Sequence, residues 1–246
     1  MIQSIKQLYG DKLAATDGEI GTVKDFYFDD RRWAIRYLVA DTGSWLTGRQ
    51  VLISPHAVDH LYQPGQLVFV KLTRKQIEDG PAIETHQPVS RQYELRYFEY
   101  YGWPAYWQGD GLWGHSGFPM VSPPSPKPMS EQAVATGTQS DIAAAHLRST
   151  QAVNGYHVKA NDGLTGHVSD FMMEDKNWAI RHLVVKTGHR LSGKEVEIPT
   201  DKIIRISYEE STVFVDLTMA GIEQSPAHHP LPVGATVSPF AATPIL

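Results

Sequence analysis

The chain has 246 residues, of which 41% are hydrophobic and 20% are charged, a composition typical of a folded protein and unlike that of a disordered one. Lysine and arginine total 22 against 27 aspartate and glutamate residues, and the net charge of −5 disfavours a nucleic-acid partner. The absence of cysteine excludes disulfides, thiolate metal sites, iron–sulfur clusters and thiol nucleophiles.

The chain is a tandem repeat. Residues 17–53 recur as residues 162–198 with a constant offset of 145, and 19 of the 37 aligned positions are identical. The N-terminal sequence MIQSIKQLYGDK lacks the apolar core of a secretory signal, and the longest apolar runs are far shorter than the roughly 20 residues that span a bilayer. We therefore expect two related folded units in a cytoplasmic protein.

Each repeat begins with a predicted β-hairpin. Residues 23–28 and 33–40 are rich in aromatic and β-branched residues, and a polar turn separates them. A hairpin centred on that turn places Phe28 opposite Trp33 and Asp25 opposite Arg36.

The second copy repeats this arrangement, with Asp170 opposite Arg181. We interpret these charged pairs as cross-strand contacts that fix the register, in preference to a functional site. Trp33 and Trp178 are predicted core anchors, with ligand stacking as the alternative.

A loop then leads to short strands at 50–53 and 195–198. At the loop tip the copies differ, since Trp45 in the first corresponds to Arg190 in the second, and these two residues are candidates for contacts with different partners.

Further strands are predicted at 66–72 and 212–217, each followed by a helical turn. Thr73 and Gln76 form a capping-box pattern in the first copy, whereas Gly221 replaces the glutamine in the second. Many short strands without a long helix predict a mainly β fold, with two small six-stranded β-barrels in tandem and short helices in the connecting segment.

The connecting segment is aromatic. Residues 90–101 place tyrosines, among them Tyr97 and Tyr101, at helical spacing, and Gly102 can end the helix. Trp103 and Trp107 follow. We favour packing of this aromatic face against one barrel or between the two, and the alternative is a surface that binds another protein.

Two stretches are predicted to lack a regular fold. Residues 119–128 are a proline-rich linker, after which Ser140 can cap a short helix, and the C-terminal residues form a proline-rich arm. The predicted organisation is a first barrel at 1–85, the connecting segment at 86–148, a second barrel at 149–226 and the arm at 227–246.

No catalytic or metal-binding motif stands out. His56 and His60 have the spacing of one helical turn, and His228 and His229 are adjacent, but no zinc-protease pattern surrounds them. Nor is there a nucleophile elbow. We expect no enzyme, no metal and no cofactor; a hydrolase would require histidines and carboxylates from separated segments to converge.

The sequences DGEIGTVKDFYFDDRRWAIRYLVADTG and NDGLTGHVSDFMMEDKNWAIRHLVVKTG resemble PRC-barrel domains. The family includes the cytoplasmic domain of the photosynthetic reaction centre H subunit and a barrel of the bacterial ribosome maturation factor, both of which dock on other proteins. The resemblance implies a six-stranded barrel that acts as an adaptor, and it carries over no catalytic residues.

We therefore expect a protein-interaction module whose partner is an unidentified protein. The two barrels are expected to pair as pseudo-symmetric halves or to support a homo-oligomer, and any membrane contact is expected to be peripheral. The alternative is a regulator that binds a small planar molecule such as a quinone at the aromatic stripe and the groove between barrels.

Overall fold

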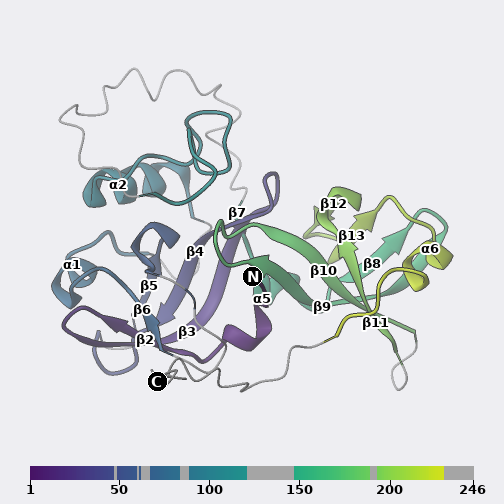
Figure 1. Ribbon diagram of the computed structural model, residues 1–246, viewed down its shortest axis with the longest axis horizontal. Coiled ribbons are helices and arrows are strands. Elements are labelled where there is room, and N and C mark those ends of the chain that lie inside the picture. The colour runs from purple at the N-terminus through teal and green to yellow at the C-terminus, as the bar shows by residue number, and fades with distance from the viewer. Residues whose placement is uncertain are drawn as a thin grey trace, which may run out of the picture.

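The computed structural model describes residues 1–46, 49–59, 61, 67–83, 89–120, 147–188 and 193–229. The fold is mainly β and has two mixed sheets, one in each lobe of the molecule (Figure 1). We call residues 2–83 the first repeat, 89–120 the linker segment and 147–228 the second repeat. Arg190, Ser140, His60 and most of the predicted arm lie outside the described residues.

The elements of the two repeats correspond almost one to one. The first repeat contains β1 (Ile2–Ser4), η1 (Lys6–Leu8), β2 (Lys12–Ala15), β3 (Gly18–Asp29), β4 (Ala34–Asp41), β5 (Gln50–Ile53), η2 (Pro55–Ala57), β6 (Val68–Phe69) and α1 (Arg74–Glu78). The second contains β7 (Leu147–Ser149), α5 (Thr150–Val153), β8 (His157–Ala160), β9 (Gly163–Glu174), β10 (Ile180–Thr187), β11 (Glu195–Pro199), η3 (Thr200–Lys202), β12 (Ile203–Ser207), β13 (Thr212–Val215) and α6 (Met219–Glu223).

The strand order is the same in both sheets where the elements correspond. It is β5-β4-β3-β2-β6 in the first sheet and β11-β10-β9-β8-β13-β12 in the second, with parallel pairing only at β2·β6 and β8·β13. Among the described residues neither path closes on itself, so the strand pairing gives two open mixed sheets.

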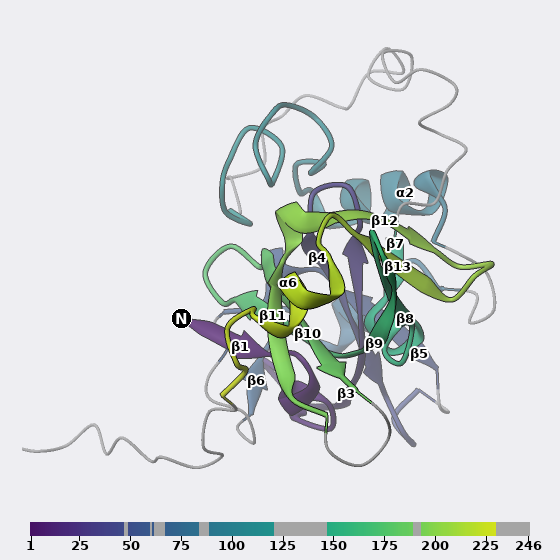
Figure 2. The same cartoon turned by 90° about the vertical axis from the view of Figure 1, so that its right-hand side faces the viewer.

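The repeats exchange their first strands. β1 pairs with β9 of the second repeat, and β7 pairs with β3 of the first, in equivalent registers: Ile2 lies opposite Glu174, and Leu147 lies opposite Asp29. Figure 2 shows β1 beside the second sheet. Residues 2–4, which the sequence places in the first barrel, therefore belong to the second sheet, and the two repeats interlock.

A pseudo-twofold axis passes between the two hairpin turns. Ala34 pairs with Ala179, its own equivalent, while the amide of Ile35 donates to the Trp178 carbonyl (2.8 Å) and the amide of Ile180 donates to the Trp33 carbonyl (2.7 Å). Both tryptophans have a positive φ, 51° and 61°, which is unusual for a bulky residue. The same backbone conformation at both positions brings the two turns together.

The predicted hairpin register is wrong. Phe28 lies opposite Ile35, and Asp25 lies opposite Val39, so Asp25 and Arg36 are not partners. The turn spans residues 30–33 and therefore contains Trp33, and irregularities at Val23/Asp25 and Tyr27/Phe28 shift the register further.

The second copy deviates in the same way, since Asp170 lies opposite Val184. The shift therefore belongs to the repeated sequence and not to one copy of it.

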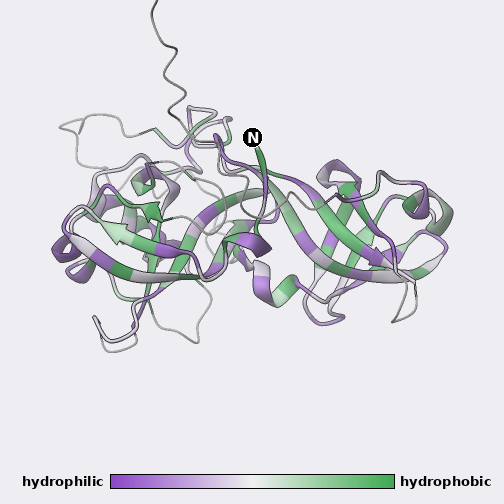
Figure 3. Ribbon diagram, turned by 60° about the horizontal axis from the view of Figure 1, so that its bottom comes forward, coloured by the Kyte–Doolittle hydropathy of each residue, from purple (hydrophilic) through white to green (hydrophobic). Residues whose placement is uncertain are grey.

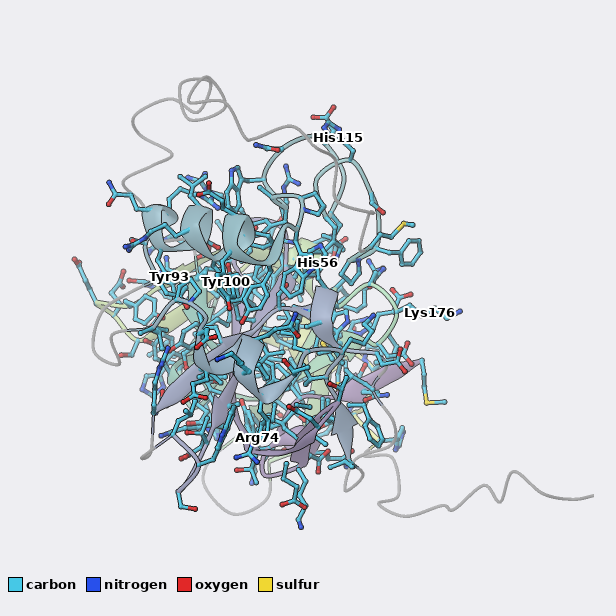
Figure 4. All side chains as sticks on the ribbon, turned by 90° about the vertical axis from the view of Figure 1, so that its left-hand side faces the viewer. His56, Arg74, Tyr93, Tyr100, His115 and Lys176 are labelled. Atoms are coloured by element: carbon cyan, nitrogen blue, oxygen red, sulfur yellow. The ribbon has the colours of Figure 1, made fainter. Side chains whose placement is uncertain are left out.

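The predicted helix of the linker segment is confirmed as α2 (Arg91–Tyr101). Ser90 caps its N-terminus by accepting from the amide of Tyr93, and Gly102 ends it with φ +67°. In Figure 4, Tyr93 and Tyr100 lie on the side of α2 that faces the first sheet. The predicted capping box of α1 is present as well.

The hydrophobic core continues through both lobes. Its buried residues come from both sheets and from the linker segment, and Phe28 and Phe171 meet across the repeats with ring centroids 5.5 Å apart. Figure 3 shows apolar residues along the strands of both lobes where the lobes join. No helix in the described part of the chain is long and apolar enough to cross a membrane.

The interlock predicts that the repeats stay together without a continuous chain. A specific protease site inserted within residues 121–146 and then cleaved should leave two fragments that co-migrate, because the exchanged strands hold them non-covalently. Analytical size exclusion with intact mass measurement tests this. A Ser4→Ala/Ser149→Ala variant, which loses one donor at each exchanged strand, should separate at lower urea, and two independent peaks from the cleaved wild type in buffer would contradict the interlock.

Candidate functional site

The exchanged strands and the helical turns that follow them supply hydroxyl and amide donors to two buried carboxylates. Asp25 accepts from the hydroxyls of Ser149 (2.5 Å) and Thr150 (2.9 Å) and from the amide of Gln151 (3.1 Å). All three donors belong to the other repeat.

Asp170 has the equivalent partners, since it accepts from the hydroxyl of Ser4 (2.5 Å) and from the amide of Lys6 (3.0 Å). Burial raises the pKa of Asp25 and of Asp170, and the hydrogen bonds oppose that rise. These contacts are reciprocal and join the repeats.

The linker segment bridges the two repeats. Arg32 donates to the carbonyls of Gly109 (3.1 Å) and Gly111, and Trp113 Nε1 donates to the carbonyl of Asn177 (2.8 Å). One side of the segment is therefore held by the first hairpin turn and the other by the second. In Figure 1 α2 lies above the first lobe, and the loop that follows it extends toward the junction of the two lobes.

Arg36 is fully buried beneath the linker segment. Its Nη2 donates to Asp29 (3.0 Å), and its Nη1 donates to the carbonyl of Leu112 (2.7 Å). The guanidinium carbon lies 3.9 Å from the centre of the Tyr106 ring and 4.9 Å from that of Trp113. An ion pair, a carbonyl and two aromatic faces replace part of the water that this cation loses, while its buried Nε has no hydrogen-bond partner among the described residues.

A second buried charge lies close by. Glu94, on α2, accepts from the hydroxyls of Tyr37 (3.1 Å) and Tyr106 (2.8 Å) and pairs with Arg91 (2.8 Å). Burial raises the pKa of Glu94, while Arg91 and the two hydroxyls lower it. This network fastens α2 to the first sheet.

His56 is enclosed by aromatic rings. It stacks on Trp103 with centroids 5.5 Å apart, and it meets Phe98 and Trp113 edge-on. Its Nδ1 lies 3.0 Å from Ser54 Oγ. Burial, reinforced by the charges of neighbouring cations, lowers the pKa of His56 to about 4, so the ring is neutral at physiological pH. Figure 4 shows it beneath α2.

The equivalent arginine of the second repeat is open to solvent. Arg181 donates from Nε (2.9 Å) and Nη2 (2.5 Å) to Glu174, and its side chain is 48% exposed. The hydrogen bond from Arg181 is the main reason why the pKa of Glu174 is lowered. Arg36 and Arg181 therefore occupy equivalent positions in opposite environments.

Arg181 borders a pocket between the repeats. The pocket has a volume of about 480 Å³ and takes its walls from both hairpin turns, the linker segment and η3. Its lining residues are Arg31, Arg32, Trp33, Leu112, Gly117, Asn177, Ala179, Ile180, Arg181, Thr200 and Asp201. Three arginines against one aspartate make it the candidate site for a small anionic molecule.

The aromatic residues proposed as contact residues pack inward. Tyr97 and Trp103 are buried, and Tyr101 stacks on Trp103 with centroids 4.6 Å apart. Trp107 is partly buried beneath Arg91, whose guanidinium carbon lies 4.1 Å from its ring. The aromatic stripe is thus part of the first repeat's core, and it does not line the pocket.

The remaining candidates are the two loop-tip residues and the two tryptophans of the hairpin turns. Trp45 is partly buried and lies against Arg74, 4.7 Å from its guanidinium carbon, while Arg190 lies outside the described residues. Trp178 is buried, and Trp33 is partly buried with its ring stacked on Phe28.

Sequence reasoning missed the partners of Asp25 and Arg36. One signal was available: Ser4 and Ser149 are the same residue type at the offset of 145, which indicates that the two serines have the same role. No group of three histidine, aspartate or glutamate side chains able to hold a metal ion occurs in the parts of the chain that the structure describes.

The two equivalent arginines should differ sharply in their effect on stability. Arg36→Gln leaves Asp29 buried without its cation and should lower the free energy of unfolding by about 3 to 5 kcal/mol. Arg181→Gln removes an exposed pair and should lower it by about 1 kcal/mol or less. Urea denaturation followed by tryptophan fluorescence measures both. Equal losses would contradict the burial contrast.

His56 should make stability depend on pH. Its pKa is about 4 in the folded chain and 6.5 without burial, so the folded state binds fewer protons. Neutral His56 makes its full contribution to the free energy of unfolding above pH 6.5. This contribution, about 3 kcal/mol in total, is lost as the pH falls toward 4.

The change is best measured as a difference between wild type and His56→Leu in urea titrations at several pH values. The difference isolates His56 from the buried carboxylates Asp25, Asp170 and Glu94, whose raised pKa values act in the opposite direction. A constant difference from pH 7 to 4.5 would show that His56 does not carry the effect.

The comparisons with known proteins give no family and no relative. The scan against models of protein families finds no match, and the search of curated proteins finds none either.

Proposed function

We propose that this protein is a cytoplasmic, non-enzymatic adaptor built from two PRC-type barrels, which presents a protein-binding surface on its second repeat. Support for the family comes from the repeated Asp-Gly, Val-x-Asp-Phe and Trp-x-Ile-Arg elements and from two mixed sheets of matching strand order. The strand exchange supports a rigid platform, because it makes one body of two repeats.

The observation that carries the proposal is an apolar tip on the second repeat, formed by Leu164 and Met219. Leu164 is 62% exposed, and Met219 is 37% exposed and lies against Gly163, the residue that precedes Leu164. The first repeat has Glu19 and Arg74 at the equivalent positions. The same scaffold thus carries a charged tip on one repeat and an apolar tip on the other.

This difference indicates that the apolar residues of the second repeat serve to bind a partner and are not needed for folding. The first repeat builds the same β2–β3 turn and α1 with charged side chains, so the fold itself tolerates charge at both positions. Exposed apolar side chains gain free energy when a partner covers them, at about 25 cal/mol per Å². The adaptor proposal assigns that partner to be a protein, either a second copy or another chain.

The test transplants the charged tip. A Leu164→Glu/Met219→Arg variant should fold like the wild type and lose its partner, because it carries the side chains that the first repeat already accommodates. Ile204→Asp is the matched control, since Ile204 is also 62% exposed and Asp59 is its equivalent in the first repeat.

Sedimentation velocity of the purified proteins and quantitative capture from a host extract report the result. With wild type and with Ile204→Asp, we expect either self-association or a captured protein whose amount is proportional to the bait. The double variant should bind the same partner at least about tenfold more weakly. Indistinguishable behaviour of all three proteins in both measurements would remove the tip from the proposal.

A further inference from the structure

The two halves of the molecule differ in what covers the same arginine. In the first repeat, the linker segment lays the Tyr106 and Trp113 rings over Arg36 and brings the Leu112 carbonyl to within 2.7 Å of Nη1. In the second repeat, Arg181 faces the pocket between the repeats. Both copies keep a carboxylate partner, Asp29 or Glu174, and the covered copy shows what else surrounds the guanidinium: aromatic faces and an oxygen acceptor.

The open copy retains unused donors. A guanidinium carries five N–H groups, and Arg181 directs Nε and Nη2 toward Glu174, so its Nη1 has no partner among the described residues. Arg32 donates from Nη1 and Nη2 to two carbonyls of the linker segment, and its Nε has no hydrogen-bond partner in the part of the chain that the structure describes. Both arginines line the pocket.

The charge of the pocket has the opposite sign to that of the whole chain. The lining residues Arg31, Arg32 and Arg181 are cationic and Asp201 is anionic, in a protein whose net charge is −5. Glu174, which lies outside the lining, pairs with Arg181, so the excess of positive charge is smaller than the three arginines alone would give. Asp201 replaces His56 of the first repeat, the ring that stacks on Trp103 there. The second repeat thus lacks the aromatic packing around this position and has a cavity beside its arginine instead.

The remaining walls are apolar. Trp33, Ala179 and Ile180 come from the hairpin turns that meet on the pseudo-twofold axis, and Leu112 comes from the linker segment. A volume of about 480 Å³ lies within the range of about 300 to 1,000 Å³ that small-molecule sites occupy. Cationic donors on apolar walls suit a ligand that is itself flat, apolar and anionic at one end.

We infer that the pocket between the repeats binds a small planar aromatic oxyanion, a carboxylate or a phosphate ester, which Arg181 and Arg32 hold by its charged end. This site goes beyond the proposed adaptor function, and it shares no residue with the apolar tip. The ligand reproduces on Arg181 what Tyr106, Trp113 and the Leu112 carbonyl provide for Arg36. Its anionic group adds the charge that a neutral aromatic molecule lacks.

Isothermal titration calorimetry with 2-naphthoate and phenyl phosphate tests the assignment on the full chain. At least one of the two should bind at a single site, and 2-naphthylmethanol, which has the ring system without the charge, should bind at least about tenfold more weakly. Affinity should also fall as sodium chloride is raised, because the pocket is open to solvent.

A matched pair of variants locates the site. Arg181→Gln should weaken binding about tenfold or more, whereas Arg205→Gln should leave it unchanged. Arg205 is the appropriate control, because it lies in the same repeat, pairs with Glu210 and is 51% exposed, close to the 48% of Arg181, but does not line the pocket.

Three results would overturn the inference. They are no saturable binding of 2-naphthoate or phenyl phosphate up to about 10 mM, an affinity for these ligands that Arg181→Gln leaves unchanged, or equally strong binding of 2-naphthylmethanol. The Leu164→Glu/Met219→Arg variant should bind 2-naphthoate or phenyl phosphate like the wild type. Failure of the adaptor proposal and failure of the pocket proposal are therefore separate outcomes.

Discussion

The structure depends on two buried carboxylates whose hydrogen-bond donors belong to the opposite repeat. Asp25 and Asp170 lie in the middle of the longest strands, where water is displaced, and a carboxylate there must be given donors or it costs several kcal/mol. Hydrogen bonds to charged groups contribute about 1.5 to 3 kcal/mol each. Separating the repeats would remove these donors from both sites at once, so the interlock is held by polar contacts as well as by strand pairing.

The linker segment breaks the symmetry that the exchange creates. It covers one of two equivalent arginines and leaves the other facing a cavity, and it does so with residues outside the repeated sequence. Two equivalent scaffolds therefore differ in chemistry. The first has a closed network that joins Arg36 and His56 to the linker segment, with Glu94 on α2, and the second has an open arginine-rich pocket beside η3. The structural role of the first and the ligand-binding role inferred for the second follow from the same feature.

Local features were predictable from sequence, and long-range contacts were not. The helix of the linker segment and the capping box at Thr73 follow from patterns within a few residues of one another, and the repeat follows from direct comparison of the two segments. The predicted hairpin register was wrong because no sequence pattern indicates that Trp33 adopts φ +51° inside the turn. As a result, Arg36 pairs with Asp29, seven residues away, and not with Asp25.

The candidate site was predicted even less well, for the same reason. The aromatic stripe was recognised, but its destination in the core depended on where α2 packs. The pocket is assembled from segments far apart in sequence, and the exchange that places them is signalled only by the pair Ser4 and Ser149. A short polar segment before each repeat gives no local indication that it pairs with the other one.

The strand exchange has the geometry of a twofold homodimer, in which residue i of one copy contacts residue j of the other and the reverse. Placing both copies in one chain changes the physics of that association. Assembly no longer depends on protein concentration, since a tether keeps each half at an effective concentration of about millimolar. A substitution can also be made on one side of the axis alone, which a homodimer never permits. This chain has such one-sided substitutions: His56 corresponds to Asp201, and Arg74 corresponds to Met219.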